Sequence, residues 1–292
     1  MVIVMNTKNN GIFRRAYELI RKVYTDESIK PGLLKSVGIK QQWSMVVGTN
    51  KDAGMALNFT GFHAIYGEDN LSDLINKTHK MIGKSLFDFA EVFIDSDKIQ
   101  ERSLCLCCLN ALSQSLMNTD RLIKNKISYS LNDQLDFIKP TDIVTIIGWG
   151  GMVSQFLGKC KEVHVSDLRP REMFETIVIS ETIDKGPKDI FFHSAEENRE
   201  VISNSDVVFI TGSTLVNDTF DELISYSKKC RIVGIYGPSA QLIPEFFFSN
   251  GINLTWLMKI KDIAKFEYDM INHFNMEQAI QGNQERYLVK NF

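Results

Sequence analysis

The 292-residue sequence lacks the features of three large classes of protein. Its longest apolar runs, such as Ile143–Ile147 and Phe246–Phe248, are far shorter than the roughly 20 residues of a membrane-spanning helix. No basic segment followed by an apolar stretch opens the chain, so we expect no secretory signal peptide. Lys and Arg total 33 against 36 Asp and Glu, which argues against electrostatic binding of nucleic acid.

Cysteine is also scarce. The five cysteines are an odd number without the spacing of a small disulfide scaffold, which fits a reducing cytoplasm. Hydrophobic residues make up 44% and charged residues 24%, the balance of an ordinary soluble globular protein. We therefore expect a cytoplasmic protein with a real hydrophobic core and no nucleic-acid or membrane partner.

The second half of the chain alternates strand-like and helix-like segments. Short, β-branched apolar runs are typical of strands buried on both faces of a parallel sheet. Between them, Ser194–Ser203 has helical character and opens with a capping box formed by Ser194 and Glu197. This alternation predicts an α/β domain with a parallel sheet. The predicted strands are Ile143–Ile147, Glu162–Ser166, Asp206–Ile210, Arg231–Ile235 and Ile252–Trp256, and a helix is predicted over Ile260–Met276.

The first half has a different pattern. An amphipathic helix over Asn10–Tyr24 precedes a strand-like, glycine-punctuated region, Ser36–Phe62, and helical segments follow at Leu71–Phe89 and Glu101–Met117. This order predicts a smaller α+β domain. A polar stretch, Asn118–Lys139, then leads into the first parallel strand, so we divide the chain into domains 1–130 and 131–292.

A glycine-rich turn follows the first parallel strand. Such glycines let a ligand approach backbone N–H groups, and a carboxylate 19 residues after Gly148 has the spacing of a ribose-binding group. The third glycine of the dinucleotide fingerprint is replaced by Val153, and no P-loop lysine is present. A ligand here would be an adenine-containing cofactor, a nicotinamide dinucleotide or S-adenosylmethionine. The candidate contacts are Gly148, Gly150, Gly151, Asp167 and Arg169.

Two polar loops follow later strands. Thr211–Thr219 is rich in hydroxyl groups, and Gly237–Ser239 repeats the pattern one strand further on. Ligands of open α/β sheets bind beyond the carboxyl ends of the strands, so these loops predict a binding crevice. The candidate ligand contacts are Thr211, Gly212, Thr214, Asn217, Gly237, Pro238 and Ser239.

Cysteine and histidine give weaker signals. Cys105, Cys107 and Cys108 lie among leucines in a helical segment, which favours small buried hydrophobes over metal ligands. His63 and His193 fall near predicted loops, where each is either a ligand or proton carrier or an ordinary histidine.

Several motifs resemble one known family. The segments Thr211–Thr219, Gly237–Ser239, Phe248–Ile252, Gly54–Leu57 and Leu109–Leu112 are similar to those of the "putative heavy-metal chelation" family. The resemblance implies an N-terminal domain like the enolase N-terminal fold, a C-terminal Rossmann-like domain and a ligand site in the cleft between them. It also implies that Asn110 faces that cleft. Hydroxyls and backbone N–H groups there suit a small anionic ligand, or a metal chelate, better than a bare transition metal.

Three functions remain open from the sequence. The first is binding or handling of a heavy metal, a metal chelate or a small anionic ligand, and the second is an enzyme with an adenine-containing cofactor. The third is a non-catalytic partner protein, since a fold by itself does not settle function. The sequence leaves open whether any reaction is catalysed. Base rates for soluble proteins favour a homodimer.

Overall fold

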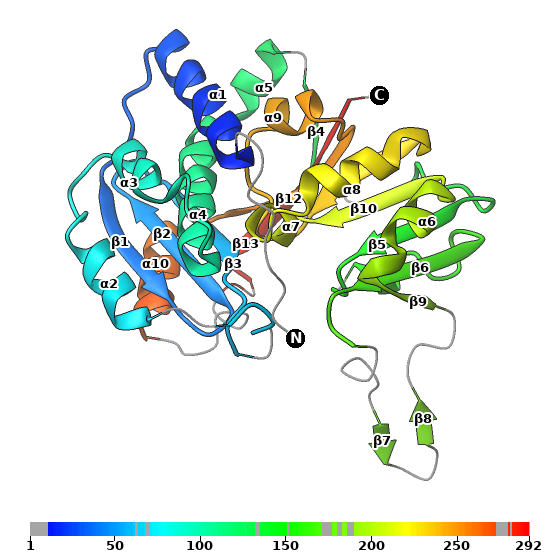
Figure 1. The fold of residues 1–292 in the computed structure, drawn as a ribbon. Coiled ribbons are helices and arrows are strands. Elements are labelled where there is room, and N and C mark those ends of the chain that lie inside the picture. Colours follow the sequence, from blue (N-terminus) through cyan, green and yellow to red (C-terminus); the bar gives the residue numbers. More distant parts are fainter. Residues whose placement is uncertain are drawn as a thin grey trace. The chain divides into compact units, whose positions relative to one another are not determined.

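A computed structural model describes residues 11–61, 64–67, 70–125, 127–131, 135–150, 152–170, 177–179, 183–185, 190–272, 280 and 282–291. Its strands form an eight-stranded sheet, a three-stranded sheet and a two-stranded hairpin (Figure 1). The chain divides into two units. The first unit is Met1–Asp133, Gly212–Phe220 and Ile235–Phe292, and the second is Gln134–Thr211 and Asp221–Gly234.

A small antiparallel sheet lies in the first unit. Its strands are β1 (Leu34–Ile39), β2 (Trp43–Gly48) and β3 (Ala53–Leu57), in that order. Both faces of β2 are buried, because α4 (Ile99–Leu116) packs on one side of the sheet and α10 (Ile263–Asn272) on the other. This arrangement confirms the predicted α+β character of the first half.

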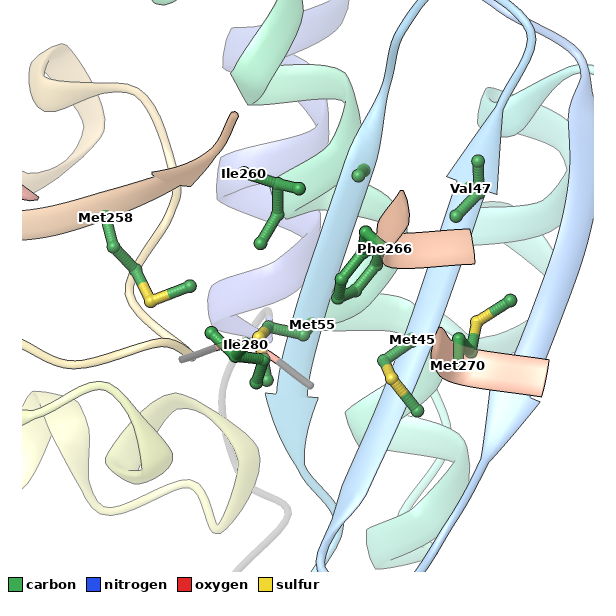
Figure 2. Packing of buried hydrophobic residues seen from close by; sticks show 9 residues of the cluster. Met45, Val47, Met55, Met258, Ile260, Phe266, Met270 and Ile280 are labelled. Atoms are coloured by element: carbon green, nitrogen blue, oxygen red, sulfur yellow. The ribbon is translucent and has the colours of Figure 1, made fainter. Parts of the chain in front are cut away.

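The side chains of this sheet alternate between its two faces. Met45 and its antiparallel neighbour Met55 point toward Phe266 and Met270 of α10, as Figure 2 shows. The intervening residues face α4, where Ser103 donates a hydrogen bond to the carbonyl oxygen of Ala56 at 3.3 Å. The cluster on the α10 side contains Met45, Val47, Ala53, Met55, Met258, Ile260, Phe266, Met270 and Ile280.

Further helices surround this core. The predicted helix over Leu71–Phe89 is two helices, α2 (Leu71–His79) and α3 (Leu86–Phe93). The break has a local cause: Gly83 has φ +83°, and the Ser85 hydroxyl accepts a hydrogen bond from the N–H of Phe87 as a new N-cap. The other helices of this unit that hold more than one turn are α1 (Ile12–Asp26), α5 (Thr119–Lys124) and α9 (Pro244–Ser249).

The large sheet is mostly parallel, which confirms the predicted α/β class. Its strand order is β4-β13-β12-β11-β10-β5-β6-β9. The bounds are β4 (Ser128–Ser130), β5 (Ile143–Ile147), β6 (Glu162–Asp167), β9 (Phe191–Ser194), β10 (Val207–Thr211), β11 (Ile232–Tyr236), β12 (Leu254–Ile260) and β13 (Gln284–Lys290).

The second unit contains the short elements between these strands. The predicted capping box is confirmed, since the N–H of Ser194 donates to Glu197 Oε2 at 2.8 Å before α6 (Asn198–Ser203) begins. Helix α8 (Phe220–Tyr226) lies almost wholly in this unit, whereas α7 (Ser213–Val216), which precedes it in the chain, belongs to the first unit. The hairpin is β7 (Ile177–Ile179) with β8 (Ile183–Lys185).

The C-terminal region differs from the prediction. Ile260 ends strand β12, and the helix begins only at Ile263. Strand β13, which pairs antiparallel with β12 and β4, was not predicted. Its charged residues interrupt the alternation of apolar and polar side chains that is typical of strands. Within the part of the chain that the structure describes, no helix is long and apolar enough to cross a bilayer.

A buried carboxyl group in the first unit provides a test of this packing. Asp52 is fully buried; one of its oxygens accepts a hydrogen bond from Ser115, and Oδ2 has no partner among the described residues. Burial raises the pKa of Asp52 because the charged form loses its hydration. The folded state therefore binds a proton more readily than the unfolded state, and ionisation destabilises the fold as pH rises above about 4.

We expect Asp52→Asn to raise the free energy of unfolding at pH 7, because the amide carries no charge for burial to penalise and keeps an oxygen that can accept from Ser115. The gain is expected to disappear below about pH 4, the ordinary pKa of aspartic acid, where both variants are neutral. Urea denaturation at both pH values measures this difference, with the exposed Asp97→Asn as a control. An equal effect of Asp52→Asn at both pH values would contradict the argument.

Candidate functional site

The loop after β10 belongs to the first unit and is tightly packed. A Cβ atom on Gly212 would lie 2.5 Å from the backbone nitrogen of Ala240, so the chain requires glycine there for close approach. Thr214 is buried in α7, while Gly237, which has φ +95°, and Pro238 are half-buried. Close packing against Ala240 thus gives Gly212 a structural role, and its contact with a ligand stays a prediction.

Asn110 and Ser239, two of the predicted ligand contacts, are hydrogen-bonded to each other. The Asn110 amide donates to the carbonyl oxygens of Ser239 and Met55, both at 3.0 Å, and its oxygen accepts from the N–H of Gln241 at 3.2 Å. The Ser239 hydroxyl accepts from the N–H of Leu57 at 2.9 Å. These hydrogen bonds connect the loop after β11 to β3 and α4. Both side chains therefore have a structural role in holding this loop in place.

Asn217 connects the other motif loop to a residue that the sequence reasoning missed. Its amide donates to the Tyr66 hydroxyl oxygen at 3.0 Å, while its own oxygen accepts from the Thr219 hydroxyl at 2.8 Å. The Tyr66 ring packs edge-on against Phe59, with centroids 5.0 Å apart. Burial raises the pKa of Tyr66, so the phenol keeps its proton and remains a hydrogen-bond donor.

The next residue, Asp218, has a strained backbone. Its φ of +63° lies in the left-handed region, which costs a non-glycine residue roughly 1–3 kcal/mol. The Arg102 side chain holds it: Nη2 donates to Asp218 Oδ1 at 2.9 Å and to the Leu215 carbonyl at 3.1 Å, while Nε donates to the Val216 carbonyl at 2.6 Å. The guanidinium also lies 4.7 Å from the ring centroid of Phe13.

The second unit contains the other predicted ligand contacts. The Asp167 carboxylate accepts four hydrogen bonds: Oδ2 from the Trp149 N–H at 2.7 Å and from Arg169 Nη2 at 2.8 Å, and Oδ1 from Arg169 N and Nε, both at 2.9 Å. A carboxylate has about four lone-pair positions, so these donors occupy them all. Asp167 and Arg169 therefore fix the glycine turn, and ribose hydroxyls would have to displace one of these bonds.

The glycine turn follows β5, which pairs in parallel with β10. Gly148 has φ +92°, a conformation that only glycine adopts easily, and Gly150 is half-buried in the same turn. Thr211 ends the neighbouring strand, so it and Gly148 lie at the same edge of the sheet. Gly151 lies outside the described residues.

The cysteines of α4 are buried, as predicted. Cys107 Sγ donates to the Ser44 carbonyl at 3.0 Å and Cys108 Sγ to the Leu86 carbonyl at 2.9 Å, and Cys105 is equally buried. Burial raises the pKa of all three thiols well above its usual value. Since metals bind the thiolate, these residues are small core side chains and not soft ligands.

Two histidines form the most distinctive group in the second unit. His164 Nδ1 and His193 Nε2 are 2.9 Å apart, and the outer nitrogens of the two rings contact Glu162 and Glu197, each at 3.2 Å. The sequence drew attention to His193, but only strand pairing brings it to His164. His63 lies outside the described residues.

Comparison with known proteins places the chain in a family. One domain model described as "putative heavy-metal chelation" matches residues 133–279, and a second with the same description matches residues 23–113. The chain belongs to this family.

Individual members resemble the chain along most of its length. An uncharacterised protein of Methanocaldococcus jannaschii is 29% identical over 224 residues, or 76% of each chain. A solved family protein of unknown function from Pyrococcus horikoshii superimposes with a TM-score of 0.70 at 20% identity, covering 96% of this chain and 100% of its own. A second solved family protein of unknown function, from Desulfitobacterium hafniense, superimposes with a TM-score of 0.68 at 17% identity. The superposition covers 96% of this chain and 99% of that protein. These likenesses show a shared fold.

The family description raises the question of whether the side chains present suit a metal ion. Among the residues with a described placement, no three His, Cys, Asp or Glu side chains converge as ligands. The motif loops bring one carboxylate, Asp218, beside hydroxyl and amide groups. Such a donor set, with one carboxylate and no thiolate or imidazole among these described groups, does not fit a bare heavy-metal ion.

Proposed function

We propose that this protein binds a heavy-metal ion as a complex with a small anionic chelator, at the Thr211–Thr219 loop. The observation that carries the proposal is the left-handed Asp218, held in place by the buried Arg102. A residue keeps a strained backbone conformation only where neighbouring groups hold it in place, and such residues cluster at ligand sites. Membership of a family described by metal chelation supports the same conclusion.

The groups around Asp218 suit both parts of such a complex. Arg102 bonds Asp218 Oδ1, which leaves Oδ2 of this partly exposed carboxylate to contact a cation. The Tyr66 oxygen accepts from Asn217, so its own O–H is directed to a further acceptor, which we assign to a carboxylate oxygen of the chelator. The protein thereby recognises the complex, and the chelator supplies the remaining metal ligands.

Equilibrium dialysis tests this proposal. Metal-free protein is dialysed against a panel of divalent metals, each with excess citrate as the chelator, and retained metal is measured by plasma mass spectrometry. We expect near one metal per chain for at least one metal–citrate complex. Tyr66→Phe removes only the hydroxyl, and we expect it to weaken retention about tenfold, since a hydrogen bond to a charged group contributes roughly 1.5–3 kcal/mol.

Matched variants separate binding from stability. Tyr268→Phe, at an exposed position of α10, is expected to leave retention unchanged. Asp218→Asn keeps a residue that tolerates the left-handed conformation but removes the charge, and it should also lose about tenfold. The proposal is wrong if the wild-type protein retains no citrate complex, or if both Tyr66→Phe and Asp218→Asn bind as the wild type does.

A further inference from the structure

Four titratable side chains form a row of contacts on β6, β9 and the helical turn after β9. Glu162 Oε2 contacts His164 Nε2 at 3.2 Å, His164 Nδ1 contacts His193 Nε2 at 2.9 Å, and His193 Nδ1 contacts Glu197 Oε1 at 3.2 Å. The two imidazole rings are nearly parallel, with centroids 5.1 Å apart and planes inclined by 14°. We call His164 and His193 the histidine pair.

The strand register and local caps hold this network. His164 is paired with Phe191, and His193 is two residues further along β9, so both histidines lie on one face as diagonal neighbours. The ring of Phe191 stacks on His164 at 4.9 Å. Glu197 is fixed by the capping box, in which its Oε2 accepts a hydrogen bond from the N–H of Ser194 at 2.8 Å.

Glu162 is fixed at the opposite end of the network. Its Oε1 contacts Lys161 Nζ at 2.8 Å while Oε2 contacts His164. A carboxylate therefore contacts the outer nitrogen of each ring of the histidine pair.

Counting hydrogens shows what the centre of the pair requires. Three contacts between electronegative atoms need three hydrogens, whereas two neutral imidazoles carry one N–H each. If both outer nitrogens donate to the carboxylates, His164 Nδ1 and His193 Nε2 face each other with bare lone pairs at 2.9 Å. That arrangement is stable only with a cation between or beside the two nitrogens.

We propose that the histidine pair is a metal site for a late first-row divalent ion such as Cu²⁺ or Zn²⁺, with water completing the coordination. Imidazole nitrogen suits these ions, and a carboxylate on the outer N–H of each histidine is the usual support of metal-bound histidine. Tetrahedral coordination at about 2.0–2.1 Å separates the two nitrogens by about 3.3 Å. On metal binding the 2.9 Å contact therefore widens by about 0.4 Å, and the two rings turn until both lone pairs point to the ion.

The surroundings meet the remaining needs of such an ion. The side chains of His164 and His193 are 18% and 19% exposed, which leaves access for metal and water ligands. Glu162 and Glu197 supply negative charge beside the ion, partly offset by Lys161. This site takes the bare ion and uses no residue of the chelate site proposed above, so each proposal stands or fails separately.

Copper titration tests the histidine pair directly. Metal-free protein receives Cu²⁺ alone, and electron paramagnetic resonance records the coupling of copper to ligand nitrogen. We expect one copper per chain coupled to two imidazole nitrogens, with the signal lost in His164→Gln and in His193→Gln. Glu162→Gln and Glu197→Gln keep both ligands and are expected to weaken copper binding roughly 10–100-fold, the usual effect of losing such an outer partner.

The controls distinguish this site from other copper ligands and from the chelate site. His79→Gln, at an exposed position of α2, should leave the spectrum unchanged, and so should Tyr66→Phe. Conversely, His193→Gln should leave retention of the metal–citrate complex unchanged. A copper spectrum without two-nitrogen coupling, or one that both histidine variants preserve, would mean that the pair holds only a proton and would overturn the proposal.

Discussion

Gly54→Ala is expected to lower the free energy of unfolding by about 3 kcal/mol, the upper end of the usual cost of overpacking. A Cβ atom on this residue of β3 would lie 2.1 Å from the carbonyl oxygen of Cys107 and 2.5 Å from the backbone nitrogen of Ala111. Both atoms belong to the backbone of α4, so no side-chain rotation relieves the clash. Strand β3 or helix α4 has to move as a whole.

The same displacement would loosen the loop after β11. The added methyl group would also lie 2.9 Å from Cβ of Asn110, whose amide holds Ser239. Urea denaturation followed by circular dichroism measures the loss. Gly11→Ser is the matched control: it adds a Cβ where nothing lies within 4 Å, and serine is favoured at the N-cap of α1. Equal stability of Gly54→Ala and the wild type would show that β3 and α4 are not packed this closely.

Arg102→Met is expected to lower the free energy of unfolding by about 3 kcal/mol, because it leaves two buried carbonyl oxygens without a donor and each such group costs roughly 1–3 kcal/mol. The Arg102 side chain is 8% exposed and bonds Asp218 and the carbonyl oxygens of Leu215 and Val216. Methionine fills much of the same volume but leaves these acceptors without a donor. The left-handed Asp218 then loses the contact that offsets its backbone strain.

Two substitutions show whether geometry or charge decides the effect. Arg102→Lys keeps the charge but not the planar fork that reaches two carbonyls and a carboxylate, so we expect it to recover little of the loss. Arg14→Met removes another arginine that contacts two acidic side chains, Glu91 and Asp95, but these lie at the surface, and we expect a change of about 0–1 kcal/mol. Similar effects of Arg102→Met and Arg14→Met would contradict this account.

Arg102 also connects stability with the proposed function. Because Arg102 bonds Asp218 and two carbonyl oxygens of the same loop, we expect Arg102→Lys to reduce retention of the metal–citrate complex. The copper spectrum of the histidine pair should stay unchanged. The two proposed sites use different side chains on different strands and loops.

Local sequence patterns determined much of the fold. The strand over Ile143–Ile147 has the predicted bounds, and the Ser194–Glu197 capping box forms as expected. Both depend on interactions within a few residues: a β-branched apolar run favours a buried strand, and a serine three residues before a glutamate caps a helix. Glycine conformation is equally local. Gly83, with φ +83°, divides the predicted helix over Leu71–Phe89 into α2 and α3.

Tertiary structure decided the contacts on which the two proposals rest. His164 and His193 are 29 residues apart, Arg102 and Asp218 are 116 apart, and Tyr66 and Asn217 are 151 apart. Neither residue of such a pair carries a local sign of the other, because sheet register and helix packing bring them together. The sequence by itself therefore determined the strands, the caps and the motif loops, whereas the folded chain decided which polar groups meet, since hydrogen bonds and ion pairs depend on distance in space and not along the chain.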